Sequence, residues 1–446
     1  MKILHYFLGF PPYRTGGLTK YSFDLMTQQA KDGHSISALW PGQMLLGSKK
    51  VRIKNRGNVQ GVASYELINP LPVPLDEGVT DIEAFTAKTD AAPYKRFLTE
   101  LKPDVIHIHT LMGLHREFVD MAAQLKIKTV FTSHDYYGIC PKVTLYRYGQ
   151  VCDNDNGCEN CIQCNCTALS KKKILILQSP LYRLVKNSPL VKKLRKQHRG
   201  NFFENELLPE IPVAQEEIPA LAQGYRDLRE YYMGILSKVD LIHFNSSLTE
   251  SVYKKYLTPK ESRVLSITHR DVQDNRDLPH KESDTLRITC LAPAKPFKGY
   301  HVLKQALDEL WADGKKDFVL RMYSAVPHPA PYMQVQDEGF SHAELKSIME
   351  DTDILVAPSV WYETFGFTVL EALSFGVPVL ISDHIGAKDI VSKGGIVLPA
   401  GSAEALKQAI ADLTPEKLQQ MRQAIRQEVA VKTWPTFMEE NYKLYR

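Results

Sequence analysis

Residues 358–373 read Pro-Ser-Val-Trp-Tyr-Glu-Thr-Phe-Gly-Phe-Thr-Val-Leu-Glu-Ala-Leu, and they follow the short apolar run Ile354–Ala357. The run predicts a buried strand, and the residues after it predict a turn and then a helix over 365–375. The first N–H groups of a helix have no partner inside it, so such a turn can hold an anion such as a diphosphate. Gly366 favours close approach because it carries no side chain. The stretch therefore indicates an α/β fold with an anion site where a strand ends.

Two glutamates flank this predicted anion site. Glu371 lies about six residues into the expected helix, roughly 9 Å along its axis at ~1.5 Å per residue. That distance suits a carboxylate that binds two ribose hydroxyls while phosphates sit at the helix start. Glu363, on the loop, is expected to face whatever group the phosphates carry. Two solvated surface charges are the alternative, but the apolar setting favours a ligand.

The rest of the chain repeats the alternation of strand and helix. The apolar runs are continuous, as in parallel strands buried on both faces, and they predict two doubly wound α/β domains. The expected strands are 2–9, 34–40, 105–109, 129–133, 240–245, 286–291, 318–323, 354–357, 377–381 and 395–398, and the expected helices are 18–31, 301–312, 341–350, 365–375 and 403–413. We expect an N-terminal Rossmann-like domain over 1–238 with an insertion at about 140–235, a second Rossmann-like domain over 239–430, and a helical tail over 431–446 that packs back on the first.

Length and composition agree with two ordinary globular domains. The chain has 446 residues, of which 44% are hydrophobic and 24% charged, and its net charge is +4. These values exclude wholesale disorder and a generally nucleic-acid-binding surface. The first apolar run, Ile3–Pro12, has only Lys2 before it and no small-residue cleavage site, so it predicts a strand rather than a signal peptide. No run reaches the roughly 18–20 apolar residues of a membrane span, so we expect a cytoplasmic protein.

The run from Asp353 to Asp383 resembles family 4 of the retaining glycosyltransferases, whose hallmark is two glutamates separated by seven residues. The resemblance implies the GT-B fold, which has two facing Rossmann-like domains with a central cleft. It also implies a nucleotide-diphosphate sugar as donor, and a glycan or lipid-linked acceptor in cell-surface polysaccharide assembly. Within it, Glu363 is expected to contact the donor sugar and Glu371 the ribose. The phosphates are expected at the backbone of Thr364, Phe365, Gly366, Phe367 and Thr368.

A second phosphate contact is expected after the strand 286–291. Lys298-Gly299 matches the family's Lys-Gly, but Pro293 stands where the family usually has an arginine. Lys295 is the nearest basic substitute. Either lysine alone has a simpler explanation as a solvated loop residue.

The resemblance is looser in the N-terminal half. Gly16-Gly17 lies between the first strand and the first helix, where backbone amides can face the donor, although a Gly-Gly pair also suits an ordinary turn. His134 ends the strand 129–133, at the edge where open α/β sheets place their sites. The family often has a catalytic histidine there. His107 and His109 are expected to alternate across a buried strand, with His109 nearer the site.

The expected chemistry follows the charges that develop when the bond to the diphosphate breaks. The leaving group becomes more negative, and Lys298 with the helix N-terminus would stabilise it. Retention in this family is attributed to attack on the same face, assisted by the leaving phosphate, so no covalent nucleophile is assigned. We expect no catalytic divalent metal, because no Asp-x-Asp stands in a context typical of metal binding. The alternatives are a nucleotide-sugar epimerase or hydrolase on this fold, or a nucleic-acid-binding zinc protein, which would leave both glutamates unexplained.

Six of the seven cysteines lie between residues 140 and 166. Thiolates two residues apart can converge on a tetrahedral zinc ion, and a cytoplasmic compartment disfavours disulfides. We expect a structural zinc site, and resemblance to a subset of bacterial family members favours four ligands. These are Cys140, Cys152, Cys158 and Cys161, with Cys164 and Cys166 as alternates. An iron–sulfur cluster is a further alternative.

The segment from Lys171 to Arg199 is strongly basic. It contains ten Lys and Arg and no Asp or Glu, with apolar residues between the charges. A basic amphipathic stretch suits an anionic membrane surface. We therefore expect peripheral attachment to the inner face of the cell membrane, with a solvated helix face or RNA binding as alternatives.

Overall fold

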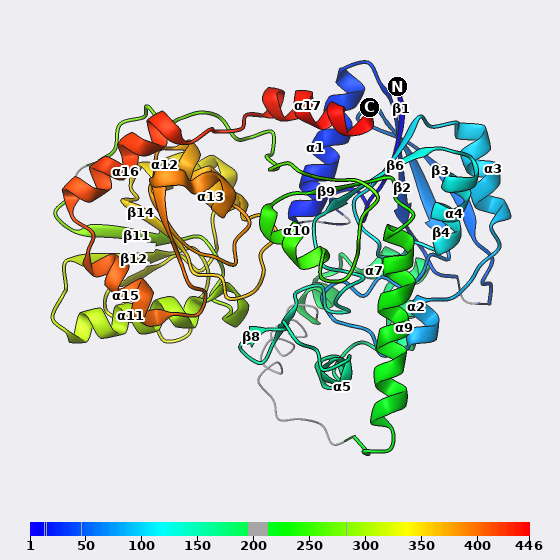
Figure 1. Cartoon of the computed structure of the whole chain (residues 1–446), viewed down its shortest axis with the longest axis horizontal. Coiled ribbons are helices and arrows are strands. Elements are labelled where there is room, and N and C mark those ends of the chain that lie inside the picture. The colour runs from blue at the N-terminus through cyan, green and yellow to red at the C-terminus, as the bar shows by residue number, and fades with distance from the viewer. Residues whose placement is uncertain (13, 15, 46, 195–212, 282) are drawn as a thin grey trace.

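The computed structural model describes all residues except 13, 15, 46, 195–212 and 282, and it consists of two α/β domains joined side by side (Figure 1). The N-terminal domain has an eight-stranded sheet in the order β10-β9-β6-β5-β1-β2-β4-β3. Its strands are β1 (Lys2–Tyr6), β2 (Ser35–Pro41), β3 (Arg52–Val59), β4 (Val62–Ile68), β5 (Val105–Ile108), β6 (Lys128–Ser133), β9 (Leu241–Phe244) and β10 (Ser262–Val264). Its helices are α1 (Gly17–Lys31), α2 (Ile82–Phe85), α3 (Ala92–Leu101), α4 (Arg116–Gln124) and α10 (Ser247–Tyr253).

The C-terminal domain has a six-stranded, wholly parallel sheet in the order β13-β12-β11-β14-β15-β16. Its strands are β11 (Leu286–Cys290), β12 (Phe318–Met322), β13 (Met333–Val335), β14 (Ile354–Ala357), β15 (Val379–Ser382) and β16 (Gly395–Leu398). The 3-10 and α-helices in order are η1 (Pro296–Lys298), α11 (Tyr300–Ala312), η2 (His342–Glu344), α12 (Leu345–Glu350), α13 (Phe367–Ser374), α14 (Lys388–Val391), η3 (Ser392–Gly394), α15 (Ala403–Ala411) and α16 (Pro415–Glu428). β14 and α13 form the strand–turn–helix unit expected from the sequence, with the helix beginning two residues later than predicted.

The N-terminal sheet extends past the expected boundary at residues 238 and 239. β9 pairs with β6 and β10 pairs with β9, both in parallel, so residues up to Val264 build this sheet. The strand expected at 240–245 exists, but it belongs to the first domain rather than the second. The reason is topological, since the local sequence of a buried parallel strand does not specify its neighbour.

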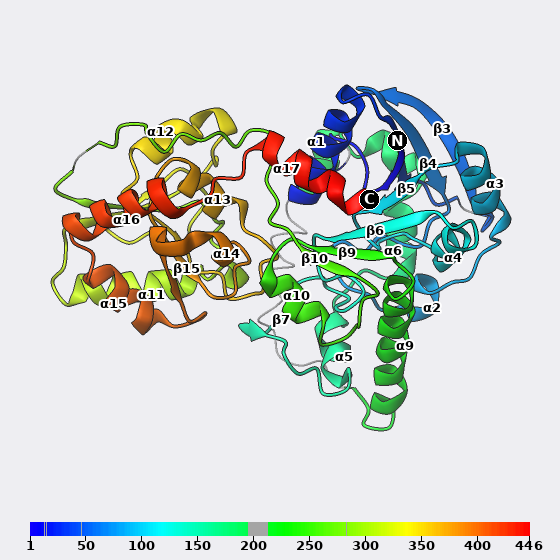
Figure 2. The same cartoon turned by 45° about the horizontal axis from the view of Figure 1, so that its top comes forward.

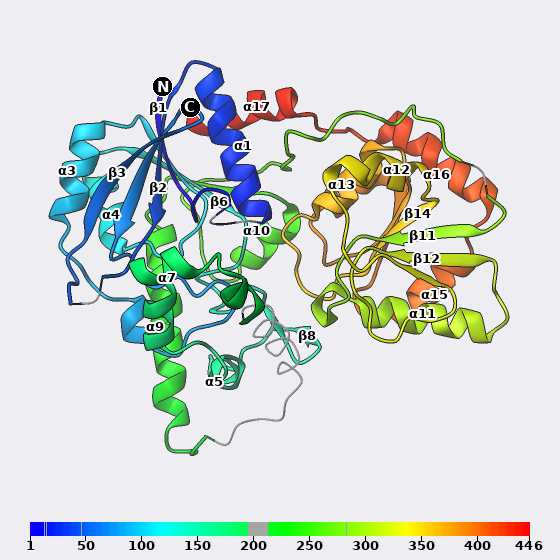
Figure 3. The same ribbon diagram turned by 180° about the vertical axis from the view of Figure 1, so that it is seen from behind.

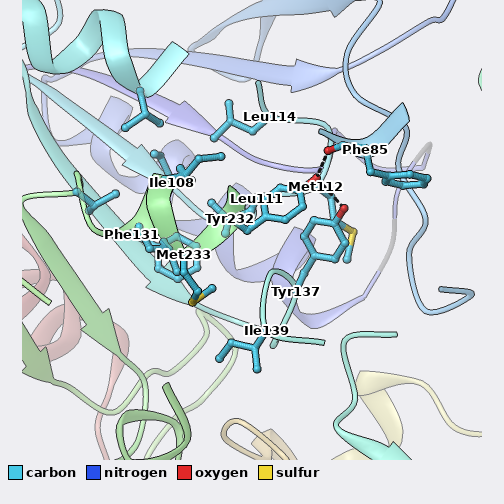
Figure 4. Close-up of a cluster of buried hydrophobic side chains, with 14 of the residues drawn as sticks. Phe85, Ile108, Leu111, Met112, Leu114, Phe131, Tyr137, Ile139, Tyr232 and Met233 are labelled. Carbon is cyan, nitrogen blue, oxygen red and sulfur yellow. Dashed lines mark hydrogen bonds between the residues drawn. The ribbon is translucent and has the colours of Figure 1, made fainter. Parts of the chain in front are cut away.

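The insertion is anchored in the core of the N-terminal domain. It contains β7 (Tyr146–Arg147), β8 (Gln150–Val151), α5 (Glu159–Asn165), α6 (Lys171–Leu177), α7 (Pro180–Val185) and α9 (Ile218–Leu236). Figure 4 shows Tyr232 of α9 among buried side chains, with its hydroxyl donating to the Phe85 carbonyl at 3.0 Å. Tyr137 therefore donates to the Tyr232 oxygen, at 2.9 Å. The start of the cysteine-rich segment is fixed to the domain by this pair.

The tail leaves the C-terminal domain and ends on the N-terminal one (Figure 2). It consists of α17 (Trp434–Tyr442) and η4 (Lys443–Tyr445). Tyr442 donates a hydrogen bond to Asp32 at 2.6 Å, and Tyr445 is buried among residues of the first sheet. No helix in the described part of the chain has the length and apolar character needed to cross a membrane.

Candidate active site between the two domains

Two helix N-termini from different domains meet at the site. Gly366, with φ of +101°, precedes α13, and Gly16, with φ of +114°, precedes α1. Among the described residues, no side chain caps either helix, and neither helix has an acidic residue in its first turn. A Cβ atom on Gly17 would lie 3.7 Å from the ring of Phe367, so the two ends are neighbours. Unpartnered N–H groups and two positive dipole ends therefore face the same region, which favours an anion.

Glu363 lies in the loop between β14 and α13. Its carboxylate accepts hydrogen bonds from Lys298 Nζ at 2.8 Å and from Ser359 Oγ at 2.7 Å. Burial raises the pKa of Glu363, but the charge and hydrogen bond of Lys298 and the hydrogen bond from Ser359 lower it more, so the pKa lies below its ordinary value. The site thus holds a charged carboxylate in contact with a charged amine.

Lys298 is held in place by the glycine that follows it. Gly299 has φ of +76°, and a Cβ atom there would lie 1.8 Å from the carbonyl oxygen of Pro358. Only glycine allows the Lys298 loop to pack this closely on the loop that carries Glu363. Lys298 Nζ also lies 5.0 Å from the centre of the Trp361 ring, a cation–π distance.

Lys295, the expected substitute for the missing arginine, occupies a different position. It precedes η1, and its Nζ lies 5.7 Å from the centre of the Phe297 ring. The ammonium that contacts Glu363 is that of Lys298.

Glu371 points from α13 into a pair of histidines. It is 7% exposed, and its Oε1 accepts a hydrogen bond from His269 Nε2 at 2.9 Å and lies 3.3 Å from His342 Nε2. Burial raises the pKa of Glu371, but the two histidines lower it more. The interaction of His342 itself with Glu371, chiefly a hydrogen bond, raises the pKa of His342. Glu371 is a charged acceptor whose partners in the structure are two imidazoles.

His134 lies beside the α13 turn on the N-terminal side. Its carbonyl accepts a hydrogen bond from Thr364 Oγ1 at 3.1 Å, and its ring centre lies 4.7 Å from that of Tyr21 on α1. Thr364 in turn accepts a hydrogen bond from Ser246 Oγ at 2.7 Å, again across the two domains. Burial, with a smaller effect of His243, lowers the pKa of His134 to about 3. His134 is therefore a neutral imidazole at the domain boundary.

The structure brings only part of the expected cysteine set together. Ligand atoms of Asp155, Cys158 and Cys161 lie within 4.8 Å of one another. The other expected ligands, Cys140 and Cys152, lie near enough to affect the pKa of their neighbours but are outside this group, as are Cys164 and Cys166. None of the described cysteines forms a disulfide.

The cysteine-rich segment touches the loop between β14 and α13 directly. Asp153 accepts a hydrogen bond from the hydroxyl of Tyr362 at 2.7 Å and pairs with Lys255 at 3.1 Å. Tyr146 of β7 places its ring centre 6.2 Å from that of Phe297. The segment therefore supports the loops that carry Glu363 and Lys298.

The basic segment forms an exposed surface, here called the basic apolar surface, over residues 171–194. Residues 195–199, which the sequence includes in the basic segment, lie outside the described residues. Of the twelve exposed large hydrophobic residues that the structure describes, seven are here: Ile176, Leu177, Leu181, Leu184, Val185, Leu190 and Leu194. The surface is attached at the carboxyl ends of β2 and β4, where Met44 N–H donates to the Gln178 carbonyl at 3.0 Å and Arg183 pairs with buried Glu66 at 2.9 Å (Figure 3).

Sequence reasoning missed three side chains of the site. Nothing in their spacing marks His269 or His342, which lie 102 and 29 residues before Glu371 in sequence, His269 in a loop and His342 at the start of η2. Ser359 stands in the quoted motif, but only the structure shows that it bonds to Glu363.

Comparisons with known proteins show which proteins this chain is similar to. Residues 285–415 match the family model described as "Glycosyl transferases group 1". A GDP-mannose-dependent alpha-mannosyltransferase from Mycobacterium tuberculosis is 35% identical over 258 residues, which cover 52% of this chain and 65% of that protein. A phosphatidyl-myo-inositol mannosyltransferase from Mycobacterium leprae is 34% identical over 82 residues, or 18% of this chain and 21% of that protein.

The fold has counterparts among solved structures. Sucrose-phosphate synthase from Thermosynechococcus elongatus is similar with a TM-score of 0.56 at 14% identity, covering 100% of this chain and 98% of that one. Residues 285–415 are therefore similar to a group 1 glycosyltransferase domain, in a chain with the GT-B fold of two facing α/β domains.

Proposed function

We propose that this protein is a retaining glycosyltransferase that moves a sugar from a nucleotide-diphosphate donor to a glycan or lipid-linked acceptor in cell-surface polysaccharide assembly. The observation that carries the proposal is the meeting of two uncapped helix N-termini, at Gly16 and Gly366, beside the Lys298–Glu363 pair. The diphosphate lies at the helix ends, the sugar toward Glu363, and the ribose at Glu371. The mannosyltransferase relative is named as dependent on GDP-mannose, which supports a nucleotide sugar as the donor.

The reaction breaks the bond between the anomeric carbon and the diphosphate oxygen. The electron pair stays with the diphosphate, whose added charge is stabilised by Lys298 and the backbone N–H groups of residues 366–368. Glu363 accepts hydrogen bonds from sugar hydroxyls and places a negative charge near the developing oxocarbenium ion. The acceptor hydroxyl attacks from the same face, and its proton passes to the leaving phosphate. These steps use only fixed protein charges and assign no covalent nucleophile.

Product analysis tests this proposal. The protein is incubated with GDP-mannose and other nucleotide sugars, with and without a membrane extract as acceptor source, and products are resolved by mass spectrometry and NMR. We expect transfer that depends on acceptor and gives an axial linkage from an axially linked donor. If the protein converts the donor to an epimer or a free sugar as fast without acceptor as with it, the protein is an epimerase or a hydrolase rather than a transferase.

We also propose that the basic apolar surface docks on the anionic inner face of the cell membrane. Its lysines and its exposed leucines occupy the same short segment, so charge attraction and apolar insertion act together. Its attachment at the carboxyl ends of β2 and β4 places it at the sheet edge that also carries the site. A lipid-linked acceptor in the membrane would then be near the donor.

Replacing Lys172, Lys173 and Lys193 by glutamine is expected to weaken binding to vesicles that contain anionic phosphatidylglycerol by about 100-fold. Each lysine near such a surface contributes ~1 kcal/mol, and three contribute ~3 kcal/mol. The measurement is co-sedimentation at low salt. The matched control changes three exposed lysines of the other domain, Lys316, Lys346 and Lys393, and should leave partition unchanged. Equal partition of both triple variants would show that this surface does not dock on membranes.

A structural zinc ion held by the cysteine-rich segment completes the proposal. Cys158 and Cys161 fit a metal because their sulfur atoms already converge with Asp155, and thiolate is a favoured zinc ligand. Cys140 and Cys152 would complete the four-thiolate set. Metal analysis of purified protein should find about one zinc per chain, and less in a Cys158→Ser variant. Absence of both zinc and iron would contradict it.

A further inference from the structure

A row of buried polar side chains crosses four adjacent strands of the N-terminal sheet. His5 on β1 lies in register with His107 on β5, and Thr132 on β6 lies in register with His243 on β9. All four are fully buried. Burying such polar groups inside a sheet costs free energy unless each is hydrogen-bonded, so each of these side chains requires a hydrogen-bond partner.

The connections form one unbroken chain of hydrogen bonds that ends at His134. Eight contacts link nine groups: Leu265 O to His243 Nε2 at 2.7 Å, His243 Nδ1 to Thr132 Oγ1 at 3.0 Å, Thr132 Oγ1 to His107 Nε2 at 2.7 Å, His107 Nδ1 to Tyr445 OH at 2.8 Å, Tyr445 OH to Gln29 Nε2 at 3.0 Å, Gln29 Oε1 to His5 Nε2 at 2.8 Å, His5 Nδ1 to His109 Nε2 at 2.9 Å, and His109 Nδ1 to His134 Nε2 at 3.3 Å.

The direction of every donor follows from the first group. The Leu265 carbonyl can only accept, so His243 must carry its proton on Nε2 and accept on Nδ1. The Thr132 hydroxyl then donates to His243, and its oxygen accepts from His107 Nε2–H. His107 is left with Nδ1 as an acceptor, so Tyr445 donates to it.

The second half of the chain continues in the same direction. Because the Tyr445 proton is already donated, its oxygen accepts from the Gln29 amide, and the Gln29 carbonyl accepts from His5 Nε2–H. His5 Nδ1 then accepts from His109, and His109 Nδ1 accepts from His134 Nε2–H. Turning the Gln29 amide around would reverse this half and leave two acceptors, the Gln29 carbonyl oxygen and His107 Nδ1, for the single proton of Tyr445.

We infer that Tyr445, near the end of the C-terminal tail, is a positioning residue that sets the tautomer of His134: the chain of hydrogen bonds places the His134 proton on Nε2 and leaves Nδ1 as the acceptor. The assignment requires neutral imidazoles throughout. Burial supports this, since it lowers the pKa of His5 and His243 to about 4 and lowers that of His107 and His109 well below the ordinary value.

The tautomer matters for the reaction, and this consequence rests on the proposed function. His134 stands next to Thr364, at the turn expected to hold the donor. With the proton fixed on Nε2, its Nδ1 accepts a hydrogen bond from a substrate hydroxyl, whereas the other tautomer would present an N–H group to it. The tail therefore does more than fasten the two domains, because it selects which form of the histidine the substrate meets.

The test is a histidine ¹⁵N NMR spectrum of the full chain, in which the ring nitrogen shifts distinguish the two tautomers. His134 is assigned by the signals lost in a His134→Gln variant. Wild-type protein should show His134 only as the Nε2–H form. Tyr445→Phe removes the hydroxyl that joins the two halves, and Thr132→Val cuts the connection to Leu265. Both should populate the Nδ1–H form at His134, and kcat should fall in proportion to the lost Nε2–H fraction while the donor KM stays constant.

Two matched variants separate this effect from simple loss of packing. Tyr442→Phe removes another hydroxyl of the tail, one that bonds to Asp32 and is not part of the series of hydrogen bonds that ends at His134. Thr132→Ser keeps the hydroxyl oxygen in place. Both should retain the wild-type tautomer. An Nδ1–H form in the wild-type spectrum, or a pure Nε2–H form in Tyr445→Phe and Thr132→Val, would overturn the inference. The spectra need no donor or acceptor, so they decide it even if product analysis rejects the proposed function.

Discussion

A Glu363→Gln variant is expected to lose roughly 10²- to 10³-fold in kcat with the nucleotide sugar that the wild-type protein uses. The amide keeps the shape of the side chain but removes the negative charge beside the developing oxocarbenium ion, and removing one such preorganised group costs about this much in other enzymes. Lys298 also loses its ionic partner at 2.8 Å, so its contact with the leaving diphosphate is less well placed. Steady-state kinetics at saturating donor measure the effect.

The control is Glu404→Gln, which changes an exposed glutamate at the start of α15 in the same domain. It should match wild type in kcat and in Tm. Because Glu363 is partly buried, the Tm of its variant must be measured as well, so that a folding defect is not mistaken for lost chemistry. A folded Glu363→Gln variant with full kcat would exclude Glu363 from the reaction.

A Glu371→Gln variant is expected to bind nucleoside diphosphate about 10- to 100-fold more weakly while keeping most of its kcat at saturation. Hydrogen bonds to a charged group contribute roughly 1.5–3 kcal/mol, and Glu371 is proposed to accept them from the ribose, away from the bond that breaks. Calorimetric titration with GDP, UDP and ADP measures the change.

His342→Gln is the informative companion, because it removes one imidazole from Glu371 but leaves the carboxylate in place. It should affect nucleotide affinity much less than Glu371→Gln does. If Glu371→Gln bound nucleotide as tightly as wild type, Glu371 would be only the structural partner of His269 and His342.

The local parts of the fold were predictable from sequence because they depend on short-range patterns. β14 and β16 have the expected bounds, since each is a continuous apolar run that ends at a turn. β3 was not expected, because it is a polar, mostly exposed edge strand. It is held by a two-residue turn to β4, in which Gln60 and Gly61 both have positive φ, and no strong turn pair such as Asn-Gly marks that turn.

The candidate site also has a part that short-range sequence patterns predict and a part that they do not. Glu363, Gly366 and Glu371 lie within one motif, so their arrangement on a turn and a helix follows from spacing. The partners of these residues come from distant segments, as Lys298 and His269 illustrate, and sequence spacing does not encode such contacts. Lys298 was found only through resemblance to a family.

The contact between Asp153 and Tyr362 could not be predicted from the sequence either. Asp153 lies in the cysteine-rich insertion, and Tyr362 immediately precedes Glu363. This hydrogen bond connects the proposed zinc site to the donor loop, so a change of metal content has a direct route to the position of Glu363. Nothing in the residue pattern of either segment predicts the pairing.

The most direct measurement is a crystal structure of the protein with the nucleoside diphosphate that stabilises it most in a thermal screen. The diphosphate should lie within hydrogen-bonding distance of the backbone N–H groups of residues 366–368 and of Lys298, with the ribose hydroxyls on Glu371. A well-ordered diphosphate bound away from the N-terminus of α13 would contradict the proposed site and the function drawn from it.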